Sequence, residues 1–221
     1  TTFRVWAPTA SDVKLATFES ASSSSATATE YQMTKGVKGT WFVTLEGDKA
    51  GTIYAYRVTR NGEKVGVIDP YARASTVNGG RGVVVDLEST NPANWSETKP
   101  AFSGRNVDAS FYELHVRDSS IDANGGVKAA DRGKFLGLAQ LGTSIGTGKA
   151  KVSTGLSFYK EMGVTHVQLL PMYDYASGGN ELSPVFNWGY DPEHFNVPEG
   201  QYSSDPTNPV ARIKELKTAI Q

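Results

Sequence analysis

The feature that most constrains the fold of this chain is a change in the spacing of its apolar residues near residue 109. Before that point, short runs rich in β-branched and aromatic residues alternate with turn-forming residues. These runs cover residues 3–6, 13–18, 30–34, 41–45, 52–60, 64–68 and 83–87. Runs of this length and spacing are typical of antiparallel sheets, so we predict an all-β, immunoglobulin-like sandwich.

Two segments between these runs predict the connections. Asn61 and Gly62 lie between two strands and form the dipeptide that favours a tight hairpin turn. Residues 20–28 consist almost only of Ser, Ala and Thr, which bury little apolar surface. We therefore expect residues 20–28 to form a mobile loop.

After residue 109 the pattern becomes strand, helix, strand, helix. We predict a buried strand at 111–116, a helix at 154–162 that ends before Gly163, a strand at 164–170 and a helix at 209–220. Alternation of this kind is typical of βαβ units with a parallel sheet. Residues 89–108, with prolines, asparagines and scattered charge, form the predicted linker between residues 1–88 and residues 109–221.

The last predicted helix carries its own start signal, because Asn208 can cap it and Pro209 suits its first turn. One predicted face of this helix is apolar and consists of Val210, Ile213, Leu216 and Ile220. The polar side chains, which we expect to face water, are Arg212, Lys214, Glu215 and Lys217.

Composition excludes several classes of function. A formal net charge of -1 provides no field that would attract nucleic acid, and no apolar run is long enough to span a membrane. The absence of cysteine excludes disulfides and thiol chemistry, and His115, His166 and His194 lack metal-ligand spacing. No signal peptide is visible, yet we favour an exported protein whose signal has been removed over a cytoplasmic one.

Residues 186–192, Phe-Asn-Trp-Gly-Tyr-Asp-Pro, combine aromatic faces with an amide, a carboxylate and a turn, which together suit a sugar. This segment resembles the Tyr-Asn-Trp-Gly-Tyr-Asp-Pro motif of type I pullulanases in the α-amylase superfamily. Residues 111–118, Phe-Tyr-Glu-Leu-His-Val-Arg-Asp, and 163–171, Gly-Val-Thr-His-Val-Gln-Leu-Leu-Pro, resemble the first two barrel strands of that family. Residues 3–10, Phe-Arg-Val-Trp-Ala-Pro-Thr-Ala, are similar to the start of its starch-binding module, CBM48.

This resemblance implies a CBM48-like sandwich over residues 1–88, followed over residues 109–221 by the first two βα units of an incomplete (β/α)8 TIM barrel. A complete barrel takes roughly 250 residues, so we expect the catalytic carboxylates to lie outside this chain. The implied function is that of the N-terminal part of a retaining pullulanase that hydrolyses α-1,6 linkages in pullulan, starch or glycogen. Its implied partners are an α-glucan and the missing C-terminal part of the enzyme.

The resemblance also implies substrate-binding residues. Tyr190 is expected to stack on the sugar next to the scissile bond and Asp191 to orient that subsite. Trp188 is a further candidate, although packing beneath the site is the stronger interpretation of its role. Phe186, which replaces the Tyr of the family pattern, lacks a hydroxyl.

Other candidates have structural interpretations that we favour. Asp118, Asp174 and Glu193 lie beyond predicted strand ends and are expected to be solvated or to cap turns. Glu113 and His115 share a predicted strand face, where a buried hydrogen-bonded pair is favoured over a proton shuttle.

The remaining histidines and the sandwich aromatics are assigned no chemistry. His166 is expected in the core, and His194 either near the substrate cleft or on the surface. Trp6 and Trp41 are expected to be buried, and neither they nor Tyr54 and Tyr56 are assigned to a glucan site.

Two other functions remain open: an isoamylase or branching enzyme of the same superfamily, and a non-catalytic glucan-binding fragment. The aromatic motif favours the pullulanase. Relatives can carry calcium, so calcium binding stays open, but no oxygen-rich loop resembles a dedicated site. We identify no metal site and predict no other cofactor.

Overall fold

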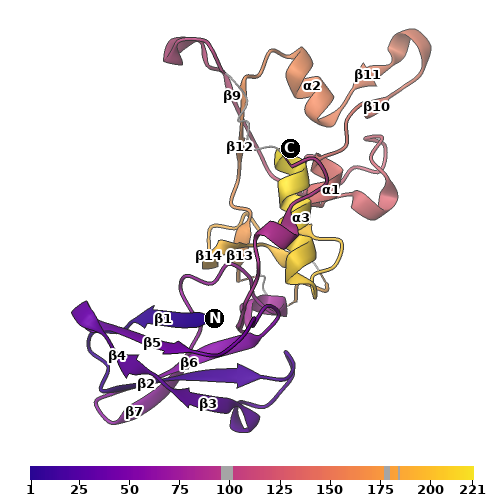
Figure 1. The fold of residues 1–221 in the computed structure, drawn as a ribbon. Coiled ribbons are helices and arrows are strands. Elements are labelled where there is room, and N and C mark those ends of the chain that lie inside the picture. Colours follow the sequence, from indigo (N-terminus) through magenta and orange to yellow (C-terminus); the bar gives the residue numbers. More distant parts are fainter. Residues whose placement is uncertain (96–101, 177–179, 184) are drawn as a thin grey trace.

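The computed structural model describes residues 1–95, 102–176, 180–183 and 185–221, and these form two parts that follow each other along the chain (Figure 1). Strands β1 to β8 build the first part, which holds the amino terminus. Strands β9 to β14 and helices α1 to α3 build the second part. Of the predicted linker at 89–108, residues 96–101 lie outside the described residues.

The first part is the antiparallel sandwich that the short runs predict. One sheet has the strand order β1-β5-β4, and the other has the order β3-β2-β6-β7 with β8 also paired to β6. The strands are β1 Thr2–Trp6, β2 Asp12–Phe18, β3 Thr29–Gln32, β4 Thr34–Lys35, β5 Thr40–Thr44, β6 Ile53–Arg60, β7 Glu63–Val67 and β8 Gly82–Val83.

The core of the sandwich is made by side chains that alternate along these strands. Phe3 and Val5 of β1 face Leu15 of β2 and Tyr56 of β6, and each of these is at most 5% exposed. Full burial of a large apolar side chain contributes about 1.5–3 kcal/mol. This cluster therefore stabilises the packing of the two sheets against each other.

The burial predicted for the sandwich tryptophans is confirmed for one and wrong for the other. Trp41 is 5% exposed, whereas Trp6 is 64% exposed. Because Phe3 and Val5 point into the core, the period of two along β1 turns Trp6 outward. Its indole N–H donates to the Lys38 carbonyl oxygen at 2.9 Å.

The hairpin predicted at Asn61 and Gly62 is confirmed. Their φ angles of 52° and 81° are the positive values that a type I′ turn requires, and Arg60 pairs with Glu63 across the turn. The run predicted at 83–87 is shorter than expected because β8 ends at Val83.

Residues 20–28 form a loop between β2 and β3, as predicted, but Arg81 holds part of it. The Arg81 guanidinium donates to the carbonyl oxygens of Ser20 and Ser23 at 3.2 and 2.6 Å. The central guanidinium carbon, Cζ of Arg81, lies 3.5 Å from the centroid of the Phe18 ring. These contacts oppose the mobility that composition alone predicts.

The second part contains one parallel strand pair, β9 with β12, and helix α2 precedes β12 in the chain, which confirms the predicted βαβ order. Two antiparallel hairpins, β10–β11 and β13–β14, were not predicted. The elements are β9 Phe111–Leu114, α1 Phe135–Leu138, β10 Ser144–Ile145, β11 Val152–Ser153, α2 Gly155–Glu161, β12 His166–Leu169, β13 Tyr173–Tyr175, β14 Pro192–Pro198 and α3 Pro209–Ile220.

The burial predicted for the strand at 111–116 is wrong over most of β9. Phe111 is 67% exposed, and Val167 on the paired strand β12 is 39% exposed. Parallel strands are normally covered on both faces, but β9 and β12 pair only with each other among the described strands. The apolar side chains of these two strands therefore remain partly exposed to solvent.

Helix α3 begins as predicted, since the Asn208 side chain accepts hydrogen bonds from the backbone N–H groups of Val210 and Ala211 at 3.1 Å. The prediction that its polar residues face water is wrong for Arg212 and Glu215, which are 1% and 7% exposed. Segments on both sides cover the helix and supply partners for these charges.

Glu215 and Lys217 find partners in the segments next to the helix. The Glu215 carboxylate accepts from the backbone N–H of Ser204 at 2.8 Å. The Lys217 ammonium donates to the Leu87 carbonyl oxygen at 2.8 Å and to Thr90 Oγ1 at 2.7 Å.

Within the described residues no helix has the length and apolar character of a membrane span, and the longest, α3, has 12 residues.

Candidate functional site

The aromatic loop, residues 186–191, is the last part of the connection between the hairpin strands β13 and β14 and leads directly into β14. The backbone N–H of Ala176 donates to the Asp191 carbonyl oxygen at 3.0 Å and closes the base of the loop. Trp188 and Tyr190 are 60% and 67% exposed. The loop therefore presents two ring faces to solvent from a closed base.

Asn187 holds the inside of the aromatic loop. Its side-chain oxygen accepts from the backbone N–H of Gly189 at 2.9 Å, and its amide nitrogen donates to Asp191 Oδ1 at 3.1 Å. Gly189 has a φ of 82°, and a Cβ there would lie 2.8 Å from the carbonyl oxygen of Pro171. Glycine is thus required for the turn. The hydrogen bond from Asn187 fixes the orientation of the Asp191 carboxylate.

His115 supports the loop from below. It is 6% exposed, and its Nε2 lies 2.9 Å from the carbonyl oxygen of Asn187. Because the backbone N–H of Asp118 donates to Nδ1 at 3.4 Å, the proton belongs on Nε2, which donates to that carbonyl. The His115 ring also packs 5.3 Å from that of Phe186 and lies near the Tyr202 hydroxyl.

The predicted pairing of His115 with Glu113 is wrong. Glu113 is exposed and accepts from Gln168 at 3.2 Å, whereas His115 follows the end of β9 and points into the interior. The prediction that Trp188 packs beneath the site is also wrong. Its ring contacts Phe186 at a centroid distance of 5.8 Å, but most of its surface is open.

The other histidines differ in burial from the predictions. His166 is half-buried between Phe102 and Phe111, with both ring centroids at 4.9 Å, rather than in the core. His194 is 9% exposed, so it is not a surface residue, and its Nε2 lies 3.0 Å from the Gly79 carbonyl oxygen.

Of the three acids predicted to be solvated, two are exposed and one is buried. Asp118 pairs with Arg117 at 2.7 Å on the surface, and Glu193 is exposed on β14. Asp174 is 1% exposed, which overturns the prediction. It lies within β13, a strand that the sequence pattern did not indicate, and its pairing with β14 turns the side chain inward.

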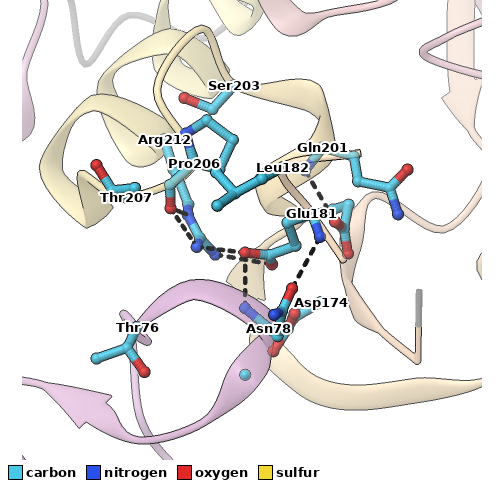
Figure 2. Close-up of polar contacts among 12 residues, drawn as sticks. Thr76, Asn78, Asp174, Glu181, Leu182, Gln201, Ser203, Pro206, Thr207 and Arg212 are labelled. Atoms are coloured by element: carbon cyan, nitrogen blue, oxygen red, sulfur yellow. Dashed lines mark hydrogen bonds and ion pairs between the residues drawn. The ribbon is translucent and has the colours of Figure 1, made fainter. Parts of the chain in front are cut away.

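Asp174 belongs to a buried acid cluster that also contains Glu181 and Glu199, each at most 1% exposed. Figure 2 shows Asp174 and Glu181 of this cluster, with Arg212 and Asn78. Arg212, from α3, forms a bidentate ion pair with Glu181 at 3.2 and 2.7 Å. Asn78, from the sandwich, donates its backbone N–H to Glu181 at 2.8 Å. The cluster therefore joins the two parts of the chain.

The pKa values of two acids in this cluster are raised well above their ordinary range. Burial, together with the nearby charges of Glu199 and Glu181, raises the pKa of Asp174 to about 8. Burial also raises the pKa of Glu199 to about 7, although the backbone N–H of Gln201 opposes that shift. No local motif marks these residues, because their partners lie far away in the sequence.

Comparison with known proteins identifies similar chains. Residues 1–72 match the family model described as carbohydrate-binding module 48 (isoamylase N-terminal domain). The pullulanase of Bacillus subtilis (strain 168) is 42% identical over 224 residues, which include 100% of this chain and 29% of that protein.

Solved structures give the same picture. A pullulanase from Bacillus acidopullulyticus superposes with a TM-score of 0.88 at 45% identity, with coverage of 100% of this chain and 26% of that one. A pullulanase from Paenibacillus barengoltzii in complex with maltohexaose and α-cyclodextrin gives a TM-score of 0.88 at 44% identity, with coverage of 97% and 33%. The chain thus spans a third or less of each of these relatives.

Proposed function

Because the chain belongs to the type I pullulanases, we propose that it is part of a debranching enzyme that hydrolyses α-1,6-glucosidic linkages in pullulan, starch or glycogen. The similarity runs along the whole chain, whereas the relatives are much longer. The activity is therefore proposed for the complete protein, and the isolated chain is expected to be inactive.

The observation that carries this proposal is the aromatic loop. Tyr190 and Trp188 offer open ring faces, while hydrogen bonds from Asn187 fix the carboxylate of Asp191 beside them. A rigid ring and a fixed acceptor suit a sugar, whose ring faces are apolar and whose edges carry hydroxyls. Tyr190 stacks on the glucosyl unit next to the scissile bond, Asp191 orients it, and Trp188 extends the contact.

The proposed domain arrangement follows the family. Residues 1–88 form the CBM48-like module, residues 89–108 the linker, and residues 109–221 the first two βα units of a TIM barrel. The match of the module over residues 1–72 and the parallel pair β9–β12 support this division. In such barrels the loops after the strands build the active face, and the aromatic loop follows β12 in the chain.

The proposed chemistry is retaining hydrolysis by two carboxyl groups, one acting as nucleophile and the other as acid and then base. These groups come from the part of the enzyme beyond this chain. The residues described here bind and orient the glucan. The C-terminal part of the enzyme is then the protein partner, and an α-glucan is the substrate.

Pullulan tests the proposal, because its maltotriose units are joined by α-1,6 linkages. The complete protein and the 221-residue chain are purified in parallel and incubated with pullulan, and the products are separated by chromatography. We expect maltotriose from the complete protein and no product from the chain. Products that keep their α-1,6 linkages, or chain transfer without new reducing ends, would instead favour a related superfamily enzyme.

A further inference from the structure

A cavity of about 190 Å³ lies against the aromatic loop, and Asn187 of that loop forms part of its wall. Three of the described residues that line it are basic, namely Arg117, Arg132 and Lys134, and none is acidic. All three come from the segment between β9 and α1. Because a hollow lined by charges of one sign concentrates ions of the opposite sign, this basic cavity is suited to an anion.

Two of these positive charges are not neutralised by an ion pair. Asp118 lies 2.7 Å from Arg117 and balances its charge. The Arg132 guanidinium donates to two backbone carbonyl oxygens at 3.2 and 2.9 Å, which orient it but carry no net charge. No ion pair among the described residues includes Arg132 or Lys134. The lining of the basic cavity therefore carries a surplus of two positive charges.

Gln201 brings a hydrogen-bond donor without an acceptor to the same cavity. Its side chain is 6% exposed, and Nε2 has no hydrogen-bond partner within the part of the chain that the structure describes. The backbone N–H of Gln201 donates to Glu199, and Figure 2 shows the side-chain amide directed away from Glu181 and Arg212. Because buried polar atoms are nearly always satisfied, this amide indicates an acceptor ligand in the cavity.

Tyr202, which also lines the cavity, supplies a second such donor. Burial raises the pKa of Tyr202 to about 12, so the hydroxyl keeps its proton at neutral pH. Its oxygen accepts from the Tyr175 hydroxyl at 3.3 Å. His115 Nε2 lies 3.1 Å away but carries the proton that it donates to Asn187, so it cannot accept from Tyr202. The Tyr202 proton is therefore left without an acceptor among the described residues.

We propose that the basic cavity binds a phosphate group. A phosphate dianion balances the two surplus charges and offers acceptor oxygens to both Gln201 and Tyr202. Arginine suits phosphate because its planar guanidinium can pair with two oxygens. A carboxylate balances one charge only, and a neutral sugar brings no charge at all. Neither Trp188 nor Tyr190 lines the cavity, so this site is separate from the proposed sugar contact and goes beyond the proposed debranching function.

Free inorganic phosphate and a phosphomonoester on a glucan share this chemistry, and calorimetry separates them. Phosphate is titrated into the complete protein at about pH 7.5, where it is close to doubly charged, and sodium chloride of equal ionic strength is the control. We expect one saturable site that sodium chloride does not reproduce, and its absence would overturn the proposal. Glucose 6-phosphate is then titrated with glucose as its control. Binding at least as tight as that of phosphate assigns the site to a phosphorylated glucan, whereas weaker binding assigns it to free phosphate.

Lys134→Met and Gln201→Met locate the site. Each removes a hydrogen bond to a charged group, so each should raise the Kd for phosphate by at least about tenfold. Without phosphate, the Tm of Gln201→Met should stay equal or rise, because a buried donor without an acceptor is removed. Lys149→Met, at an exposed lysine that does not line the cavity, is the matched control and should keep the Kd. An unchanged Kd in Lys134→Met and Gln201→Met would also overturn the proposal, and Lys134→Met alone decides it if Gln201→Met does not fold.

Discussion

The buried ion pair between Arg212 and Glu181 provides the sharpest stability prediction. Both side chains are 1% exposed, and Arg212 binds the carboxylate through two nitrogens. Arg212→Met keeps most of the apolar volume but leaves the carboxylate buried without its counter-charge. Removing one partner of a buried pair costs about 3–5 kcal/mol. At about 2–4 °C per kcal/mol for a chain of this size, the Tm should fall by roughly 6–20 °C.

The assay is thermal and urea unfolding in EDTA, with a double-mutant cycle. Glu181→Gln keeps an acceptor for Asn78 without the charge, so Arg212→Met/Glu181→Gln should be more stable than Arg212→Met alone. Arg105→Met, at an ion pair whose arginine side chain is 82% exposed, is the matched control and should change stability by less than about 1 kcal/mol. A loss below about 1 kcal/mol for Arg212→Met would refute the reasoning.

Three further predictions concern single residues. Hydrogen bonds from Lys64 and Lys14 lower the pKa of Glu30 to about 2, so wild-type stability should fall as the pH drops from about 4.5 to about 2, and Glu30→Gln should flatten that slope in acid unfolding. Arg81→Ala should speed cleavage of residues 20–28 by proteinase K, and an unchanged rate would show that the arginine does not hold the loop. Asn187→Ala should loosen the aromatic loop, seen as faster hydrogen exchange there with a Tm within a few degrees of wild type.

Sequence patterns predict the local elements of this fold well. The hairpin at Asn61 and Gly62 follows from two residues that tolerate positive φ, and helix α3 from the cap at Asn208 followed by proline. These elements depend on neighbours within a few positions. Their local chemistry is therefore sufficient to place them.

The buried charges were not predictable in the same way. Glu181 bonds to Asn78, 103 residues away, and Arg212 is buried only because distant segments cover its helix. A polar residue in an amphipathic pattern is assigned to solvent unless its partner is known. The β13–β14 hairpin was missed for a related reason, since β13 has three residues and too few positions to reveal an alternation.

The aromatic loop shows which part of a site the sequence can supply. Tyr190 and Asp191 are recognised from their motif, and the structure adds what holds them, namely Asn187 and the buried His115. That support involves a backbone carbonyl 72 residues from the histidine. No local pattern encodes such a contact.

Kinetics of the complete enzyme on pullulan with Tyr190→Ala test the central claim most directly. Loss of the ring removes stacking worth about 0.5–1.5 kcal/mol and misplaces the reacting sugar, which can cost on the order of a hundredfold. We expect kcat/KM to fall by roughly tenfold to a hundredfold, with a smaller loss for Tyr190→Phe and an unchanged Tm, since Tyr190 is 67% exposed. A near-normal kcat/KM for Tyr190→Ala would contradict the assignment of the aromatic loop to the substrate.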